Sequence, residues 1–509
     1  MMERQNGRKI GWMVALRRRH LPLQLFCPLI FLSGALAPGT SAEDRTGQGG
    51  PWQATGFKAG EVTDTSAIVW TRLTARAERN PADGPLVRIV EARDTEGEDY
   101  PRPRAVTGIV YPKGASVADL RDAAPGTSGE VRVRYRPHAS DEPWRETDWR
   151  AVDPQADFTR QFLLSDLSPD THYELLVESR AGEEGPTGQS LGGRFRTAPA
   201  ADTPSNVSFT VSTGQMYDDK DAPEGFALYA AMREFDPDFF VHTGDIVYYD
   251  QLAKTAELAR YHWQRTYSLP TNVAFHRFVP SYFINDDHDT WTNDCWPTMQ
   301  SNQMYRFTFD QGLRIFREQV PMGERTYRTV RWGKDLQIWL VEGRDFRSPN
   351  PAPDGPQKTI WGEAQKAWFK RTVAESDAAF RVLISPTPIV GPDRGNKRDN
   401  RSNRNFAHEG NEIRRFIASQ ENVIVVCGDR HWQYLSIDPA TGVREYSCGP
   451  ASDPHAGGWQ QSDFRPEYHK FLRVAGGFLS VTIKQDDGEP QMVLRFHGVN
   501  GAALFEDRL

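Results

Sequence analysis

Cysteine is scarce in this sequence, and its positions follow no regular spacing. Four of the 509 residues are cysteine: Cys27 lies near the N-terminus, and Cys295, Cys427 and Cys448 follow much later. The last three allow at most one disulfide bond, which excludes a disulfide framework. The stability of the fold must therefore come from packing.

An excess of basic residues is missing as well. Lysine and arginine number 61 against 68 aspartates and glutamates, which gives a net charge of −7. A chain of this charge has no general electrostatic footprint for nucleic acid, so we expect no nucleic-acid-binding surface. Hydrophobic residues make up 38% of the chain and charged residues 25%. This composition is typical of a globular protein, and the length allows two or three domains.

One apolar run stands near the N-terminus, Leu21–Ala37. Basic residues at positions 17–20 precede it and small residues at 40–42 follow it, which is the pattern of an export signal. Two prolines and a glycine interrupt the run and argue against a stable membrane anchor. We therefore predict that residues 1–42 direct export to the periplasm or the extracellular space. The paired arginines suit the twin-arginine route.

Residues 43–199 have the pattern of an all-β domain. Short β-branched and aromatic segments alternate with turns rich in Gly, Pro and Asp, which predicts an antiparallel sandwich of the immunoglobulin or fibronectin type. Ser165–Tyr173 resembles the strand corner of fibronectin-type domains, where the tyrosine packs on the core. No carboxylate–histidine cluster occurs in this region, so we interpret it as a scaffold or lid, with carbohydrate binding as the alternative. Ala198–Ser205 has the composition of a linker.

From residue 206 to 509 strand-like and helix-like segments alternate. This rhythm predicts a largely parallel sheet flanked by helices, closed near the C-terminus by two antiparallel strands. The fold class is therefore α/β with an N-terminal all-β domain. Asp393–Arg404, dense in Arg, Asn and Asp, is predicted to be a mobile polar loop.

Three strands of the second region end in polar side chains. Asp238–His242 leads into Gly-Asp, Val423–Cys427 leads into Gly-Asp-Arg-His, and Tyr282–Asp289 ends in Asp-Asp-His-Asp. Open α/β sheets bind their ligands at the carboxyl ends of the strands, so we expect these groups to meet at one edge. So many carboxylates close together would raise one another's pKa values unless a cation neutralised them. The three runs therefore indicate a metal centre.

These runs resemble the alkaline phosphatase D family of calcineurin-like metallophosphoesterases, whose catalytic domain is a four-layer sandwich behind a β-rich N-terminal domain. The resemblance extends over nearly the whole chain that follows the predicted signal. Besides the three strand ends, it includes the family's V-x-W-T-R stretch, two central segments and a G-x-x-Q-x-x-W-L helix, which correspond to Ile68–Leu73, Glu324–Arg328, Gly343–Arg347 and Gly362–Phe369.

The resemblance implies a set of metal ligands. Asp245 corresponds to the carboxylate that bridges two metals, and Tyr248 to the phenolate that ligates Fe³⁺. Asp287 stands where other metallophosphoesterases have asparagine. Asp429 and His431 stand where the wider superfamily has Gly-His-x-His, so each would serve a different metal. Oxygen-rich ligation suits Ca²⁺, Fe³⁺ or both better than zinc, with another divalent metal as the alternative.

The catalytic residues follow from the same resemblance. A metal-activated hydroxide would attack phosphorus in line. His288 would donate a proton to the leaving-group oxygen or stabilise its charge. Asn293, and Arg328 or Arg344, would hold phosphate oxygens.

The sequence departs from the family at the end of the first strand. Members have Ser-Cys-Gln there, and the cysteine ligates iron, whereas this chain has Gly214 in that place. Asp218 or Asp219 could reach in instead. The Tyr248/His431 metal is therefore expected to be weak, different or missing.

Four further histidines stand outside the implied ligand set. Asn405–Gly410 lacks the family's aspartate, and His408 could replace it as a ligand or contact the substrate. We expect His242 to be a hydrogen-bonded interior histidine. His455 and His469 receive no role.

The predicted function is that of an exported phosphoesterase acting on small phosphodiesters, phosphomonoesters or both. Two alternatives remain: a related one-metal hydrolase of other esters, and a non-catalytic anion-binding protein, which Gly214 favours.

Overall fold

The computed structural model describes residues 44–46, 49–92 and 104–509, and residues 40–509 form one compact unit. The predicted export signal lies outside the described residues. Two large sheets dominate. The nine-stranded sheet has the order β24-β23-β22-β12-β13-β14-β2-β3-β9. Its strands are β2 (Phe57–Gly60), β3 (Ala67–Arg72), β9 (Thr159–Leu164), β12 (Val207–Ser212), β13 (Phe239–His242), β14 (Ser281–Phe283), β22 (Gly477–Asp486), β23 (Glu489–Gly498) and β24 (Ala503–Arg508).

The second large sheet has seven strands in the order β15-β16-β17-β18-β20-β19-β21. The pairs β16/β17, β17/β18 and β18/β20 are parallel. Its strands are β15 (Arg328–Trp332), β16 (Leu336–Leu340), β17 (Phe380–Ser385), β18 (Val423–Cys427), β19 (Gln433–Ile437), β20 (Arg444–Cys448) and β21 (His469–Arg473).

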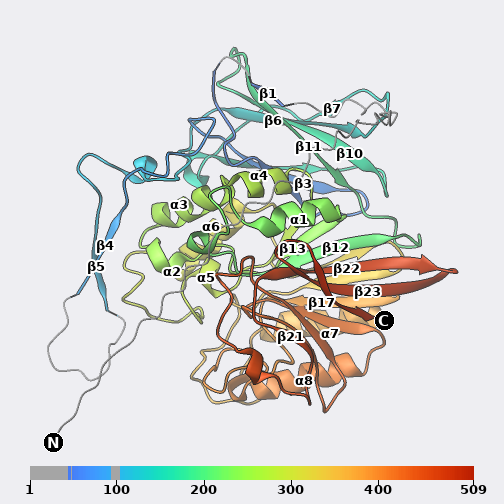
Figure 1. Ribbon diagram of the computed structural model, residues 1–509. Coiled ribbons are helices and arrows are strands. Elements are labelled where there is room, and N and C mark those ends of the chain that lie inside the picture. The colour runs from blue at the N-terminus through green and yellow to red at the C-terminus, as the bar shows by residue number, and fades with distance from the viewer. Residues whose placement is uncertain (1–43, 47–48, 93–103) are drawn as a thin grey trace, which may run out of the picture. The chain divides into compact units, whose positions relative to one another are not determined.

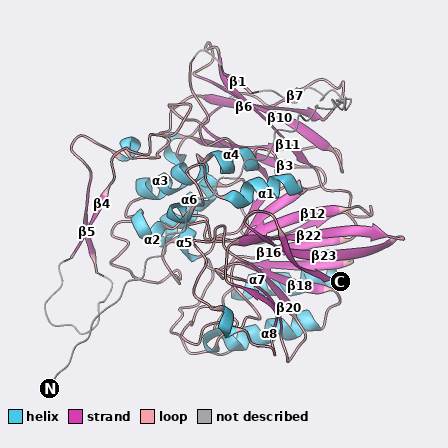
Figure 2. Ribbon diagram, viewed as in Figure 1, coloured by secondary structure: helices cyan, strands magenta, loops and turns pink. Residues whose placement is uncertain are grey.

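Eight α-helices are described, and Figure 2 shows them in cyan around the sheets. They are α1 (Ala227–Phe235), α2 (Tyr249–Leu252), α3 (Ala256–Tyr267), α4 (Pro270–His276), α5 (Asp287–Thr290), α6 (Phe309–Gln319), α7 (Gly362–Glu375) and α8 (Ala407–Ala418). None of these helices combines the length and apolar character that a membrane span requires.

Alternating side chains assign the layers. In β17, Val382 and Ile384 join a core shared with the nine-stranded sheet, whereas Leu383 faces the other way into a cluster with Phe369 of α7 and Ile413 of α8. Because side chains of a strand alternate between the two faces, the two sheets face each other and α7 and α8 cover the outer face of the second one (Figure 1).

The nine-stranded sheet is covered in the same way. Phe239 and Val241 of β13 enter the shared core, and Phe240 packs with Tyr229 of α1 and Phe275 of α4. Helices, two sheets and helices therefore follow one another. The predicted α/β class is confirmed in this form.

The N-terminal β region contributes to two sheets. A six-stranded sheet holds β1 (Arg45–Thr46), β6 (Glu130–Pro137), β7 (Arg145–Glu146), β8 (Arg150–Ala151), β10 (His172–Arg180) and β11 (Thr187–Arg196), and a hairpin joins β4 (Arg88–Glu91) to β5 (Val106–Val110). At the expected strand corner, Tyr173 is buried and its hydroxyl accepts a hydrogen bond from the Ser168 amide at 2.9 Å.

Strands β2, β3 and β9 behave differently, because they extend the nine-stranded sheet instead. Ser281 of β14 pairs with Gly60 of β2, and β3 and β9 follow beyond it. The division into domains at residues 199–206 stays a prediction.

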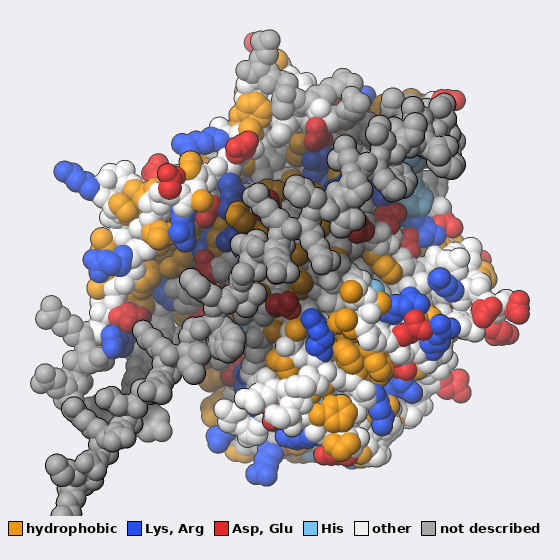
Figure 3. Space-filling model, viewed as in Figure 1, with side chains coloured by type: hydrophobic (Ala, Val, Ile, Leu, Met, Phe, Trp, Pro, Cys, Tyr) orange, Lys and Arg blue, Asp and Glu red, His pale blue; other side chains and the backbone are white. Residues whose placement is uncertain are grey.

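On the face shown in Figure 3, the basic and acidic side chains of the described residues are interspersed.

Candidate active site

The polar runs lie where parallel strands of both sheets end. Strands β12, β13 and β14 are mutually parallel and end at Ser212, His242 and Phe283. The two sheets touch at this edge: Thr213 forms a parallel bridge to Pro450, and a Cβ on Gly428 would lie 2.5 Å from Thr243 Oγ1. Only glycine at 428 allows so close an approach. Polar groups therefore meet as expected, but they come from the edges of two sheets and not, as predicted, from one.

Both Gly-Asp turns place their aspartate in a left-handed conformation. The φ angle is +55° at Asp245 and +60° at Asp429. Residues with side chains rarely adopt this region, and where they do the surrounding structure holds them there. Both carboxylates are thereby held at the ends of buried strands.

One cluster joins the first turn to the helix that follows β14. A ligand atom of Asp245, of Asp287 and of His288 all lie within 4.8 Å of one another. Asp245 and Asp287 are almost fully buried. His288 Nδ1 forms an ion pair with Asp250 Oδ2 at 2.9 Å, which fixes the ring. The three residues are therefore preorganised around one small space.

The charges of this cluster depend strongly on one another. Burial raises the pKa of Asp245 to about 7, although the positive charge of His288 stabilises the carboxylate and lowers the pKa. Burial also raises that of Asp287, but the positive charges of Arg344 and His288 outweigh it and hold the pKa of Asp287 below its usual range. For His288, burial lowers the pKa, and the carboxylates of Asp250, Asp287 and Asp245 raise it well above its usual value.

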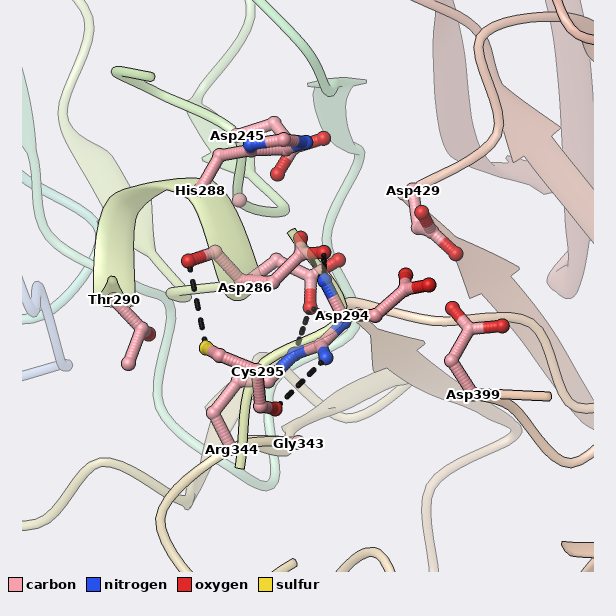
Figure 4. A network of polar contacts seen from close by, with 12 residues as sticks. Asp245, Asp286, His288, Thr290, Asp294, Cys295, Gly343, Arg344, Asp399 and Asp429 are labelled. Carbon is pink, nitrogen blue, oxygen red and sulfur yellow. Dashed lines mark hydrogen bonds and ion pairs between the residues drawn. The ribbon is translucent and has the colours of Figure 1, made fainter. Parts of the chain in front are cut away.

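The four residues of the Asp-Asp-His-Asp run divide their tasks. Asp289 accepts hydrogen bonds from the amides of Ile246 and Asp286 at 2.9 and 2.6 Å, so it ties the two strand ends together. Asp286 Oδ1 accepts one from Arg344 Nε at 2.6 Å, and Arg344 Nη2 lies 3.7 Å from Asp287 Oδ1. Figure 4 shows Arg344 reaching up to these carboxylates. Arg344 therefore anchors the floor of the cluster.

Asp429 faces the same space from the second sheet (Figure 4). Its neighbour is Arg430, which forms ion pairs with Asp429 itself and with Asp393, the latter at 3.1 Å. Burial raises the pKa of Asp429 to about 7, although the positive charge of Arg430 stabilises the carboxylate and lowers the pKa. Asp429 therefore already has a positively charged partner, Arg430.

The segment predicted to be a mobile loop is built into this side of the site. Lys397 Nζ binds Asp294 Oδ1 at 2.6 Å and lies 3.4 Å from Asp399 Oδ2. Asp399, Asn400 and Arg401 are fully or almost fully buried. The segment is irregular, as predicted, but part of it is buried against the site instead of facing solvent; its mobility stays a prediction.

A second group of donors surrounds the other side of Asp245. Tyr248 Oη and His431 Nε2 each lie 3.4 Å from Asp245 Oδ2 and 3.3 Å from each other. His455, to which the sequence assigned no role, joins them with its Nε2 at 2.5 Å from Tyr248 Oη. Burial lowers the pKa of both histidines to about 3, so their imidazoles are neutral.

Three predicted site residues lie outside these groups. Arg328 donates to Glu61 Oε2 at 2.9 Å and to the carbonyls of Phe283 and Thr326 at 3.0 Å. Its donors are committed to this structural ion pair, which argues against the predicted role on phosphate. Asn293 is exposed on the segment after α5, and His408 is exposed at the start of α8.

His242 is buried as expected. It has a weak polar contact with the Gly244 backbone, but neither ring nitrogen makes a hydrogen bond of ordinary geometry within the described structure. Burial lowers the pKa of His242 to about 3.

Sequence reasoning missed three contributors: Asp250, Asp399 and His455. Asp219 was considered as a substitute ligand, and the structure places it against His455 Nδ1 instead. Asp250 lies in the single turn of α2, and Asp399 and His455 lie on segments without regular spacing; the polar run 393–404 and the Asp-Pro-His run at 453–455 were the available signals.

The donor set fits a cation. Asp245 Oδ1 and Asp287 Oδ1 are buried and accept no hydrogen bond within the described structure. Buried anionic oxygens of this kind are costly unless a positive charge compensates them. Carboxylate, phenolate and imidazole donors are metal ligands. Asp245 and Asp287 fit one cation with His288 beside it, and the other Asp245 oxygen faces the hydroxyl of Tyr248 and the imidazole of His431.

Comparison with solved structures defines the class of the fold. A structure described as PhoD is 15% identical, covers 90% of both chains and has a TM-score of 0.67. The purple acid phosphatase PPD1 of yellow lupin (Lupinus luteus) is 11% identical, covers 89% of this chain and 73% of its own, and has a TM-score of 0.59. The described fold is thus similar to the folds of these two structures.

The family model of PhoD-like phosphatases matches residues 209–492. This is more than half of the chain, which therefore belongs to the PhoD-like phosphatase family. The predicted resemblance is confirmed, and the chain is a phosphatase-type hydrolase. No curated protein matches the sequence significantly.

Proposed function

We propose that the chain is an exported, metal-dependent phosphoesterase that hydrolyses phosphodiesters, phosphomonoesters or both. One observation carries this proposal: Asp245, Asp287 and His288, from strand ends far apart in the sequence, meet within 4.8 Å. Membership of the PhoD-like phosphatase family supports the reaction class. Export is supported by the sequence of residues 1–42 alone.

The cations of the proposed site are held mainly by carboxylates. Asp245 and Asp287 would hold one, and Asp245 with Tyr248 and His431 the other, while Asp429 faces the space between the two sheets. Bound cations would supply a hydroxide near neutral pH and neutralise charge that develops on the phosphoryl oxygens. Ca²⁺ or Fe³⁺ suits the oxygen-rich donors.

The side chains have their own tasks in this proposal. Asp250 holds His288 through Nδ1 and keeps it protonated, so the Nε2 proton can pass to the leaving-group oxygen. The Tyr248 ring lies against His288, with ring centroids 4.3 Å apart and the planes tilted by 34°, and restricts the position of the imidazole. Arg344 orients the carboxylates of Asp286 and Asp287 and does not reach the substrate, because its donors are buried.

Metal analysis combined with turnover of a model diester and a model monoester tests the proposal. The purified chain should contain metal, hydrolyse at least one of the two substrates, and lose activity on chelation and in Asp245→Ala. His172→Gln, an exposed substitution on β10, serves as the matched control. Turnover that survives chelation overturns metal dependence. Bound metal without turnover of either ester supports instead the anion-binding alternative that Gly214 suggested.

A further inference from the structure

The position where the family has a cysteine is filled from elsewhere in this chain. Gly214 follows β12 with φ +46°, and a Cβ placed on it would lie 3.2 Å from His455 Cδ2 and 3.3 Å from His431 Nε2. Two contacts fix the segment before His455 against this glycine: the Thr213–Pro450 bridge and a 2.9 Å hydrogen bond from the Ala451 amide to the Gly214 carbonyl. The His455 ring therefore occupies space beside Gly214 that a cysteine side chain would need.

Four donor atoms converge beside this ring. Tyr248 Oη, His431 Nε2 and Asp245 Oδ2 are separated by 3.3, 3.4 and 3.4 Å. Nitrogen and oxygen ligands about 2.0–2.1 Å from a tetrahedral cation are roughly 3.4 Å apart, so these three atoms already have ligand spacing. His455 Nε2 is the fourth donor, 2.5 Å from Tyr248 Oη. This short distance must open, and the His455 ring must adjust, for a cation to enter.

The orientation of His455 is that of a ligand. Its Nδ1 lies 2.8 Å from Asp219 Oδ2. With Nδ1–H donating to this carboxylate, the lone pair of Nε2 is directed at the cluster. Metal-binding histidines have this arrangement, in which a carboxylate fixes the tautomer and the ring. Asp219 follows Gly214 by five residues, so the loop that lacks the cysteine supplies the carboxylate that orients its substitute.

We propose that His455 is a metal ligand that replaces the family's cysteine, and that Asp219 is its positioning residue. The resulting site comprises Asp245, Tyr248, His431 and His455. An imidazole is neutral where a thiolate carries a negative charge, and imidazole donors favour transition metals over Ca²⁺. The site therefore takes a transition-metal cation such as iron. This inference rests on the proposed metal-dependent function, but binding can be measured without turnover.

Metal content and affinity test the inference. The full chain and the variants His455→Gln and Asp219→Asn are reconstituted with Fe³⁺, and iron is quantified together with the visible tyrosinate-to-iron absorption of Tyr248. His455→Gln should lose about one iron per chain and most of the absorption band. Asp219→Asn should retain the site with affinity lowered 10–100-fold. His172→Gln is the matched control, and circular dichroism establishes that each variant is folded.

The outcomes separate the inference from the proposed function. Unchanged iron content and an unchanged band in folded His455→Gln would overturn the ligand assignment, whatever the activity. Loss of iron in His455→Gln from a wild-type chain that binds metal but turns over no ester would support the ligand assignment and contradict the proposed hydrolase. If His455→Gln does not fold, Asp219→Asn decides: wild-type affinity in that variant overturns the inference.

Discussion

The two Gly-Asp turns at the ends of β13 and β18 have the same backbone but different electrical surroundings. Asp245 and Asp429 both follow a buried parallel strand, both adopt a left-handed φ, and burial raises the pKa of each to about 7. Asp429 forms an ion pair with Arg430, whereas the partners of Asp245 are the imidazoles of His288 and His431 and the phenol of Tyr248.

This difference indicates which carboxylate depends on a cation. Arg430 carries a permanent charge and compensates Asp429 at every relevant pH. Among the described residues Asp245 forms an ion pair with His431 but with no arginine or lysine, and it stands between both groups of donors. The same local motif therefore has two electrostatic roles, and neighbours distant in sequence decide between them.

The largest effect is expected at Asp245. Asp245→Asn removes the charge shared by both groups of donors while preserving the shape of the side chain, so both cations should be lost. We expect kcat/KM to fall by roughly 10³-fold or more, the scale of losing a preorganised electrostatic contact. Metal analysis and ester hydrolysis check this. Retention of both metals with near wild-type turnover would contradict the shared role of Asp245.

His288 lies beside the Asp245 turn and not beside the Asp429 turn. Its substitution therefore tests the surroundings of Asp245 alone. We expect His288→Asn to lower kcat by about 10²–10⁴-fold, the typical contribution of a general acid. Its metal content should stay at the wild-type level. Because His288 also belongs to the cluster of candidate ligands, loss of metal in this variant would instead identify it as a ligand.

A smaller effect is expected at the second turn. Asp429→Asn leaves Arg430 with Asp393 as its partner at 3.1 Å, so the surroundings of the turn remain compensated. We expect the affinity of the protein for one of its two metals to fall about 10–100-fold. The tyrosinate-to-iron absorption of Tyr248 should stay unchanged. Metal titration of Asp245→Asn and Asp429→Asn side by side gives the contrast. Equal losses in the two variants would show that Arg430 makes no difference.

These contrasts also mark what the sequence could predict. The strand before the second turn, Val423–Cys427, was predicted with its observed bounds, because a short β-branched run ending at Gly-Asp leaves little ambiguity. Asp245, Asp287 and His288 were predicted to converge for the same reason: parallel strands bring their carboxyl ends to one edge. Periodicity and strand ends are local properties that a single sequence displays.

The remaining features depend on tertiary contacts. Arg328 was predicted to hold a phosphate oxygen, yet it forms an ion pair with Glu61, 267 residues earlier. No local sequence pattern predicts that partner. His455 reaches the site from an irregular segment that is placed by the contacts of Pro450 and Ala451 with Thr213 and Gly214. Asp219, at the end of a 3-10 turn, orients its ring. The extension of the nine-stranded sheet by β2 is likewise a long-range pairing, through Gly60 and Ser281.

The smallest expected effect concerns a difference between β13 and β18, the strands that precede the two Gly-Asp turns. His242 stands three residues before Asp245, where β18 has Val426 three residues before Asp429. Both ring nitrogens of His242 are buried without a hydrogen bond of ordinary geometry, and burial lowers its pKa to about 3. The unfolded chain has an ordinary histidine pKa of about 6.5, so below that value it binds a proton that the folded protein refuses.

Stability should therefore fall as the pH drops from about 6.5 towards 3, by about 2 kcal/mol at pH 5 on account of His242 alone. His242→Val copies the corresponding residue of β18 and should reduce this acid sensitivity without changing metal content. Denaturant unfolding of the wild type and the variant at pH 7 and pH 5 measures the difference. If the gap in unfolding free energy between the two proteins does not change with pH, His242 is not held neutral by burial, and the two strands do not differ in this respect.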